Sequence, residues 1–129
     1  MNIEHVAIYV NNLEVEKDFF VKYFGAKISD EFGYFPNGFA CCFLAFNNGL
    51  LLEIWHVNGM FDPKKAKYRS CYHHIALNVG DKNAVNNLTQ QMEDDGVYIV
   101  AAPRLTGDGY YASIVTDPEG NEIELLAGD

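Results

Sequence analysis

Apolar and polar residues alternate along eight short segments of this chain, and this alternation predicts that each segment is a β-strand. The first four segments cover residues 3–10, 26–30, 39–46 and 50–57, and the last four cover residues 73–79, 97–101, 110–116 and 121–126. Turn sequences separate the last two strands of each group, NNG at 47–49 and DPEG at 117–120. Proline second and glycine fourth in DPEG suit a type I turn.

A helix is predicted after the first strand of each group. Asn12 and Asp81 stand at N-cap positions, and Gly25 and Gly96 stop the two helical patterns. The apolar residues expected to face the core are Leu13, Phe20 and Phe24 in the first helix and Val85, Leu88 and Met92 in the second. The order of elements in each group is therefore βαβββ.

The two groups also repeat one another in sequence. Residues 5–8 read HVAI and residues 74–77 read HIAL, while GLLLEI at 49–54 matches GNEIEL at 120–125. We therefore predict one domain, 1–129, of the α+β class. It is made of two βαβββ modules, 1–57 and 72–129, that are joined by a linker at 58–71. The modules are expected to form curved mixed β-sheets with the helices on the convex face.

The composition is that of a globular protein and excludes several kinds of partner. Nine basic residues stand against eighteen acidic ones, a net charge of −9, which is the wrong sign for nucleic acid or an anionic membrane surface. No run of about 18 apolar residues predicts a membrane span, and no basic region precedes an apolar one at the N-terminus. Three cysteines do not indicate a disulfide framework, so we expect a cytoplasmic protein.

Strand alternation brings four ionisable residues to the face that the helices leave open. Val6 and Ile8 point to the helix-covered face, so His5 points to the other. Four ionisable side chains point to the open face by the same alternation: His5, Glu53, His74 and Glu124. Carboxylates on a buried face need protons, cations or hydrogen bonds. Two Glu–His salt bridges would satisfy them, but a divalent metal accounts better for one His and one Glu at equivalent positions of each module.

The other polar residues receive weaker interpretations. His56 and His73 have the opposite parity in their strands, so we expect them to support the ligands from outside or to pack on the helix side. Four basic residues crowd into the linker, namely Lys64, Lys65, Lys67 and Arg69. They either form a solvated loop or meet an anionic substrate at the rim of a pocket.

These motifs resemble the vicinal oxygen chelate superfamily, which includes glyoxalase I, epimerases, antibiotic resistance proteins and extradiol dioxygenases. The resemblance rests on HVAI, DFFVKYFG, HIAL and DPEGNEIELL and covers nearly the whole chain. Two histidines with two glutamates look most like bacterial glyoxalase I, a lactoylglutathione lyase. This resemblance implies metal ligands His5, Glu53, His74 and Glu124 and a Ni²⁺, Co²⁺ or Zn²⁺ ion. It also implies isomerisation of a 2-oxoaldehyde–thiol hemithioacetal through a metal-stabilised enediolate, with Glu124 as the catalytic base and Glu53 as its catalytic counterpart.

The residues that would hold the substrate depart from that family pattern. Lactoylglutathione lyases usually carry Arg where this chain has Tyr9 and Asn where it has Val57, and both help to hold glutathione. Asn58, Arg69 and Arg104 are nearby in sequence and are candidates to replace them. Tyr9 and Trp55 share the predicted ligand face, where they either favour a bulky or aromatic substrate or form a wall or subunit interface. Another metalloenzyme activity of the superfamily (epimerase, thiol transfer to an antibiotic, extradiol dioxygenase) or non-enzymatic binding of a small ligand remains open.

A further expectation concerns assembly. Each βαβββ module makes only half of a cup, so its open sheet edge and ligand face need a partner module. The linker is long enough for the partner to come from the same chain or from another. We expect a homodimer with two metal sites, and we favour sites to which one chain contributes His5 and Glu53 and its mate contributes His74 and Glu124.

Overall fold

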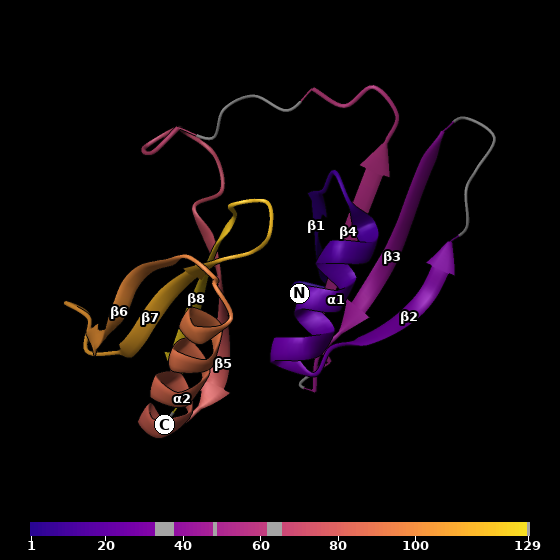
Figure 1. Cartoon of the computed structure of the whole chain (residues 1–129). Helices are drawn as coiled ribbons and strands as arrows, with labels where there is room; N and C mark the ends of the chain where they lie inside the picture. Colours follow the sequence, from indigo (N-terminus) through magenta and orange to yellow (C-terminus); the bar gives the residue numbers. More distant parts are fainter. Residues whose placement is uncertain (33–37, 48, 62–65, 129) are drawn as a thin grey trace. The chain divides into compact units, whose positions relative to one another are not determined.

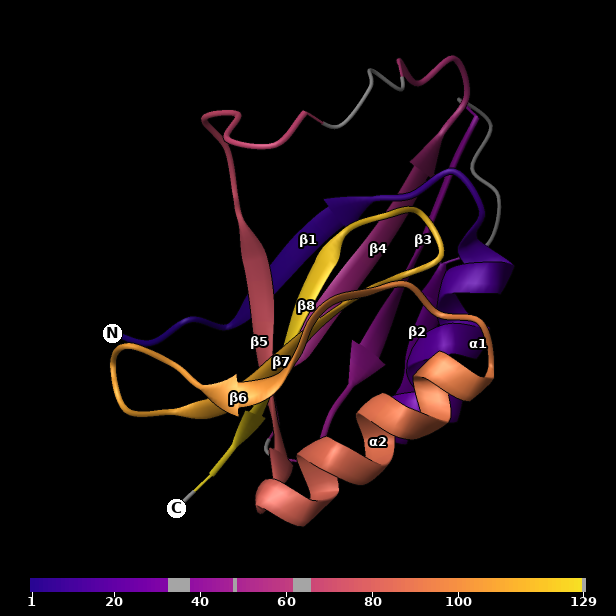
Figure 2. The ribbon, with the colours of Figure 1, turned by 60° about the vertical axis from the view of Figure 1, so that its left-hand side comes forward.

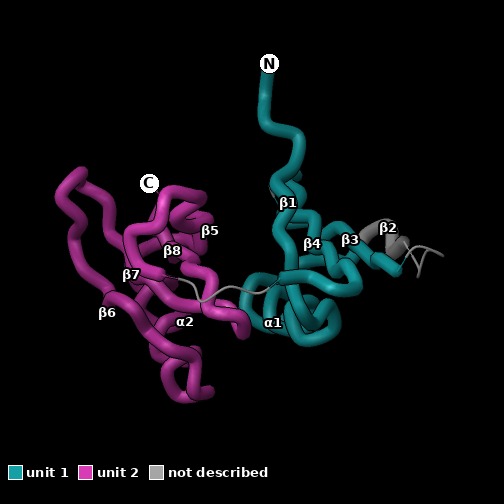
Figure 3. The backbone as a smooth tube through the Cα atoms, turned by 90° about the horizontal axis from the view of Figure 1, so that it is seen from above, with its two compact units in different colours: residues 1–64 teal, residues 65–129 magenta. Residues whose placement is uncertain are grey.

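The computed structural model of the chain describes residues 1–32, 38–47, 49–61 and 66–128. It divides into two compact units, Met1–Lys64 and Lys65–Asp129 (Figures 1 and 3). The boundary between the units falls inside the segment 58–71 that the sequence pattern predicts to be a linker. Part of that segment, 62–65, lies outside the described residues.

The first unit is a four-stranded mixed sheet with one helix. Its elements are β1 (His5–Tyr9), α1 (Leu13–Phe24), β2 (Lys27–Phe32), β3 (Phe39–Ala45) and β4 (Leu51–Val57). The strand order is β1-β4-β3-β2, in which β1 is parallel to β4 and the other pairs are antiparallel. The first strand of the unit therefore pairs with the last.

The second unit has the same topology. Its elements are β5 (His74–Gly80), α2 (Lys82–Asp94), β6 (Ile99–Leu105), β7 (Tyr111–Thr116) and β8 (Glu122–Ala127). The strand order is β5-β8-β7-β6, with β5 parallel to β8. The predicted α+β class, with two βαβββ modules and mixed sheets, is thus confirmed.

The helix ends follow the predicted capping residues. The Asn12 side chain accepts a hydrogen bond from the Val15 amide at 3.1 Å, and Asp81 accepts one from the Ala84 amide at 2.8 Å. Gly25 ends α1 with a φ of 62°, a left-handed conformation that costs glycine little. Among the described residues, no helix has the length and apolar character that a membrane crossing requires.

The core of each unit lies between the helix and one face of its sheet. In the first unit α1 packs mainly on β2, β3 and β4, and in the second α2 packs on all four strands (Figure 2). The residues buried to 2 % exposure or less include Val10, Phe20, Leu44 and Ile54 in the first unit and Val85, Met92, Val115, Ile123 and Leu125 in the second. Val6 shares the predicted helix-covered face but is 36 % exposed, because it lies on the edge strand β1.

Most strands begin and end within two residues of their predicted bounds, and the largest difference is in β6. The sequence pattern ends the sixth strand at residue 101, but β6 continues to Leu105 through Pro103. Proline removes one donor from a sheet ladder, and an edge strand tolerates this loss. Because β6 is at the edge of its sheet and its register shifts between Ala101 and Arg104, the strand accommodates Pro103.

A pair of matched substitutions in the second unit tests this packing. Leu125 on β8 is fully buried, whereas Leu105 on β6 is 67 % exposed. Leu125→Ala is expected to lower the free energy of unfolding by about 2–5 kcal/mol, because it removes buried methyl groups and leaves a cavity. Leu105→Ala should change it by no more than about 0.5 kcal/mol. Urea unfolding curves measure both, and equal losses for the two variants would contradict the assignment of the core.

Candidate metal centre

His74 and Glu124 form an ion pair on the open face of the second sheet. The distance from His74 Nε2 to Glu124 Oε2 is 3.0 Å, and the two side chains are 30 % and 18 % exposed. The parallel pairing of β5 with β8 causes this contact, because Ala76, two residues after His74, is the register partner of Glu124. Side chains at register partners and at every second residue share a face.

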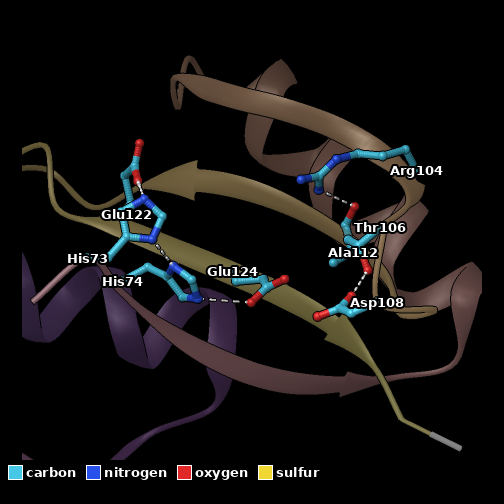
Figure 4. A network of polar contacts seen from close by, with 8 residues as sticks. All are labelled: His73, His74, Arg104, Thr106, Asp108, Ala112, Glu122 and Glu124. Carbon is cyan, nitrogen blue, oxygen red and sulfur yellow. Dashed lines mark hydrogen bonds and ion pairs between the residues drawn. The ribbon is translucent and has the colours of Figure 1, made fainter. Parts of the chain in front are cut away.

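His74 also contacts its neighbour in sequence, and the contacts extend to a second carboxylate (Figure 4). His74 Nδ1 lies 2.6 Å from His73 Nδ1, and His73 Nε2 lies 3.2 Å from Glu122 Oε2. Four side chains are thereby linked in the order Glu122, His73, His74 and Glu124. Of the two expectations for His73, contact with the candidate ligand His74 is the one the structure shows, rather than helix-side packing. Residue 73 precedes β5, so strand alternation does not fix its direction.

The first unit repeats the arrangement of the His and Glu. Ala7, two residues after His5, is the register partner of Glu53 on the parallel neighbour β4. The pKa of His5 is raised above its usual value, first by a hydrogen bond to the Glu4 carboxylate and further by the charges of Glu4 and Glu53. The negative charge of Glu53 therefore acts on the His5 ring and favours its protonated form. The His5 ring also meets Phe43 edge to face, with 5.5 Å between centroids.

Glu53 has a partner that sequence patterns do not reveal. The indole Nε1–H of Trp55 donates a hydrogen bond to Glu53 Oε1, and the Trp55 ring stacks on Phe39 with 5.2 Å between centroids. Glu53 and Trp55 are two residues apart on β4, so both point to the same face. The charge of Glu53, together with burial as the larger cause, raises the pKa of the Cys41 thiol.

The donor types and their protons fit a divalent cation. The contact of His73 Nε2 with the Glu122 carboxylate calls for a hydrogen on that nitrogen, and between two neutral rings the close Nδ1 atoms then need the hydrogen of His74. His74 Nε2 then presents its lone pair to the Glu124 carboxylate, which is unfavourable unless a proton or a cation lies between them. Imidazole with carboxylate suits Zn²⁺, Co²⁺ and Ni²⁺. In the described part of the chain no three His, Cys, Asp or Glu side chains are grouped so that they could hold a metal ion.

The predicted substrate residues lie in different places. Tyr9 is 67 % exposed on β1, where it is the register partner of Trp55. Arg69 is exposed in the segment before β5. The Arg104 guanidinium donates to the Ala112 carbonyl at 2.9 Å (Figure 4). His56, on β4, forms a 3.0 Å hydrogen bond between Nδ1 and the Val10 carbonyl.

The chain belongs to the glyoxalase/bleomycin resistance protein/dioxygenase superfamily, whose sequence profile matches residues 2–125. Its fold is similar to that of a glyoxylase/bleomycin resistance protein/dioxygenase domain from Frankia, with a TM-score of 0.84 and 12 % identity over 100 % of this chain and 93 % of that one. No curated protein matches the sequence.

Two glyoxalases are similar at 25 % identity. One is the trypanothione-dependent glyoxalase I of Leishmania major, with a TM-score of 0.77 over 98 % of this chain and 86 % of that one. The other is a possible glyoxalase from Bacillus cereus, with a TM-score of 0.70 over 98 % of both chains. The family and its fold are thereby established for this chain, and the family includes several activities.

The contact between Trp55 and Glu53 provides an optical test of the candidate ligand set. Trp55 is the only tryptophan of the chain, so its fluorescence comes from one place. Titration of metal-free protein with Co²⁺ is expected to quench this emission strongly, because the ion would lie beside the residue that accepts the indole N–H. Glu53→Ala, which removes that carboxylate, should weaken the quenching at equal Co²⁺. Unchanged emission in protein shown by metal analysis to carry Co²⁺ would place the ion away from Glu53.

Proposed function

We propose that this protein is a metal-dependent lyase or isomerase of the glyoxalase type, which converts the hemithioacetal of a 2-oxoaldehyde and a thiol into a 2-hydroxyacyl thioester. The observation that supports it best is the pair of His–Glu arrangements, one in each unit, in which the same strand register places His and Glu on one face. Membership of the superfamily and the similarity to a glyoxalase I and to a possible glyoxalase support the same reaction class.

Four side chains would hold the metal: His5, Glu53, His74 and Glu124. Two imidazoles and two carboxylates favour Ni²⁺, Co²⁺ or Zn²⁺ over Mg²⁺ or Ca²⁺, which prefer all-oxygen ligands. A bound divalent cation would polarise the two neighbouring oxygens of the substrate and stabilise negative charge that develops on them. The remaining chemistry belongs to the side chains of this protein.

Glu124 is the residue that moves the proton. Its carboxylate takes the proton from the carbon bonded to sulfur, and a proton is returned to the adjacent carbon, so the isomerisation neither gains nor loses protons. His74 Nε2 lies 3.0 Å from Glu124 Oε2 and is its contact in the protein. Glu53 would act on the opposite side of the substrate, where the Trp55 N–H fixes one of its oxygens.

The proposed substrate includes any small biological thiol rather than glutathione alone. Tyr9 and Trp55 would form an aromatic wall beside Glu53. Arg69 and Arg104 are the candidates to meet an anionic thiol. The similar Leishmania major enzyme is trypanothione-dependent, which is a reason to test thiols other than glutathione.

The direct test of the proposal combines metal analysis with an activity assay. The purified protein is loaded in turn with Ni²⁺, Co²⁺ and Zn²⁺ and mixed with methylglyoxal and glutathione, trypanothione, bacillithiol or cysteine. Formation of a thioester, followed by ultraviolet absorbance, is expected with at least one combination and should stop when the metal is chelated. Metal-loaded protein that forms no thioester with any of these thiols would refute the proposed reaction.

Replacement of the proposed base gives a residue-level prediction. Glu124→Gln is nearly isosteric but cannot accept a proton, so kcat should fall by about 10²–10⁴-fold, the usual contribution of a positioned acid–base group. The circular dichroism spectrum should remain that of the wild type. Glu93→Gln removes an equal charge from the exposed face of α2 and serves as the control. Activity within a few-fold of the wild type in the Glu124 variant would remove this residue from the mechanism.

We also propose that the protein acts in the cytoplasm as a homodimer. Each unit holds half of the proposed ligands, and each sheet has two edge strands, which commonly pair with another chain. The three cysteines are free thiols, as a reducing compartment requires.

Subunit mixing tests whether two chains share one site. His5→Ala and His74→Ala should each be inactive, because each removes a ligand. When the two variants exchange subunits, shared sites predict recovery of up to about a quarter of wild-type activity, because one of the two sites in a mixed dimer keeps all four ligands. A dimer that shows exchange without recovery would locate each site within one chain. A strict monomer by light scattering would refute the assembly.

A further inference from the structure

The residue that precedes each candidate histidine ligand contacts the Nδ1 atom of that histidine. Glu4 bonds to His5 Nδ1, and His73 contacts His74 Nδ1 at 2.6 Å. Glu4 and His73 occupy equivalent positions of the repeat, one residue before the matching histidines. The two side chains are chemically different, but each contacts Nδ1 of the histidine that follows it. The two units therefore share this contact although the residue that makes it differs.

The contact in the first unit assigns the proton of His5. A carboxylate only accepts hydrogen bonds, so Nδ1 of His5 must carry the hydrogen that bonds to Glu4. In the neutral ring the lone pair is then on Nε2. Glu4 therefore leaves His5 with Nε2 as its nitrogen for a metal.

The second unit needs one more residue for the same result. An imidazole can either donate or accept at Nδ1, so His73 by itself would not assign the proton of His74. Glu122 removes this ambiguity, because its carboxylate, 3.2 Å from His73 Nε2, requires a proton on that nitrogen. In a neutral His73 ring Nδ1 is then an acceptor, so His74 donates its Nδ1–H to it, while His74 Nε2 faces Glu124 (Figure 4). With a cation between His74 Nε2 and Glu124, His74 Nε2 needs no hydrogen of its own. The repeat-equivalent of Glu122 is Leu51, which cannot accept a hydrogen bond from a side chain. In the first unit the Glu4 carboxylate bonds to His5 directly, so the assignment of its proton does not need a third residue.

We propose that Glu4 in the first unit and the His73–Glu122 pair in the second are positioning residues that hold His5 and His74 with Nδ1 protonated and Nε2 presented to the metal. This inference rests on the proposed metal-dependent function and adds three residues to it. Metal-ligating histidines generally donate their other N–H to a carboxylate, carbonyl or water, which fixes the tautomer and the ring orientation.

A purely structural role for these contacts makes a different prediction. Glu4 and His73 have side chains that are 71 % and 73 % exposed, and exposed ion pairs contribute little to stability. Removing them should therefore leave the thermal unfolding temperature of the metal-free protein nearly unchanged. The proposal predicts that metal affinity falls instead, by about tenfold for each contact, at the lower end of the usual range because the contacts are exposed.

The experiment measures the Zn²⁺ dissociation constant by competition with a chromophoric chelator. Glu4→Ala, His73→Ala and Glu122→Ala should each weaken binding by about tenfold. Glu4→Gln and Glu122→Gln keep an oxygen that accepts the same N–H, so both should bind Zn²⁺ nearly as the wild type does. Glu14→Ala removes an exposed carboxylate from α1 and controls for the loss of charge alone.

Nuclear magnetic resonance of the Zn²⁺-loaded protein gives a second readout that does not depend on activity. Long-range nitrogen–proton spectra should show His5 and His74 coordinated through Nε2, with Nδ1–H signals that exchange slowly with water in the wild type and quickly in the alanine variants. Wild-type protein that binds no Zn²⁺ would refute the proposed function itself. Wild-type protein that binds Zn²⁺ while all three alanine variants match its affinity, or that binds through Nδ1, would refute only this inference.

Discussion

The parallel pairing of the first strand with the last strand in each unit is the constraint on which the candidate site depends. It brings together residues that are 48 and 50 positions apart in the chain, His5 with Glu53 and His74 with Glu124. In both units the glutamate is opposite the residue two after the histidine, so the two side chains share a face. A slip of one residue would turn the glutamate into the core beneath the helix. The chemistry of the site therefore depends on strand register.

Much of this architecture could be predicted from the sequence because it depends on short local patterns, namely strand alternation, helix caps and the internal repeat. Alternation and repeats gave the strands and the shared face of the histidines and glutamates, and Asn12 and Asp81 marked the helix starts. The contact between Trp55 and Glu53 could not be predicted, since shared parity does not fix a rotamer. The extent of β6 through Pro103 was missed because tolerance of proline depends on a strand being at an edge, which only tertiary pairing decides.

The two glutamates have unlike partners, and this difference favours unlike roles. Glu53 accepts a hydrogen bond from Trp55, whose ring is stacked on Phe39, so its orientation is restrained by a packed aromatic pair. Glu124 faces His74, a group that also bonds elsewhere and can exchange its partner for a proton or a cation. A carboxylate that must take up and release a proton benefits from the less restrained position. The contacts of this chain thus agree with Glu124, rather than Glu53, as the base.

The two units have the same His and Glu at equivalent positions, but the side chains next to them on the sheet differ. Phe43 and Ile114 are the antiparallel register partners of Glu53 and Glu124, so they hold equivalent places beside the two carboxylates. Tyr9 and Trp55 have Asn78 and Leu126 as their counterparts in the second unit. The strand neighbours of the donors are thus aromatic in the first unit, and their counterparts in the second unit are aliphatic or amide side chains. The two units therefore share the register that places His and Glu on one face but differ in aromatic content, and the first unit offers the larger flat apolar surface beside its donors.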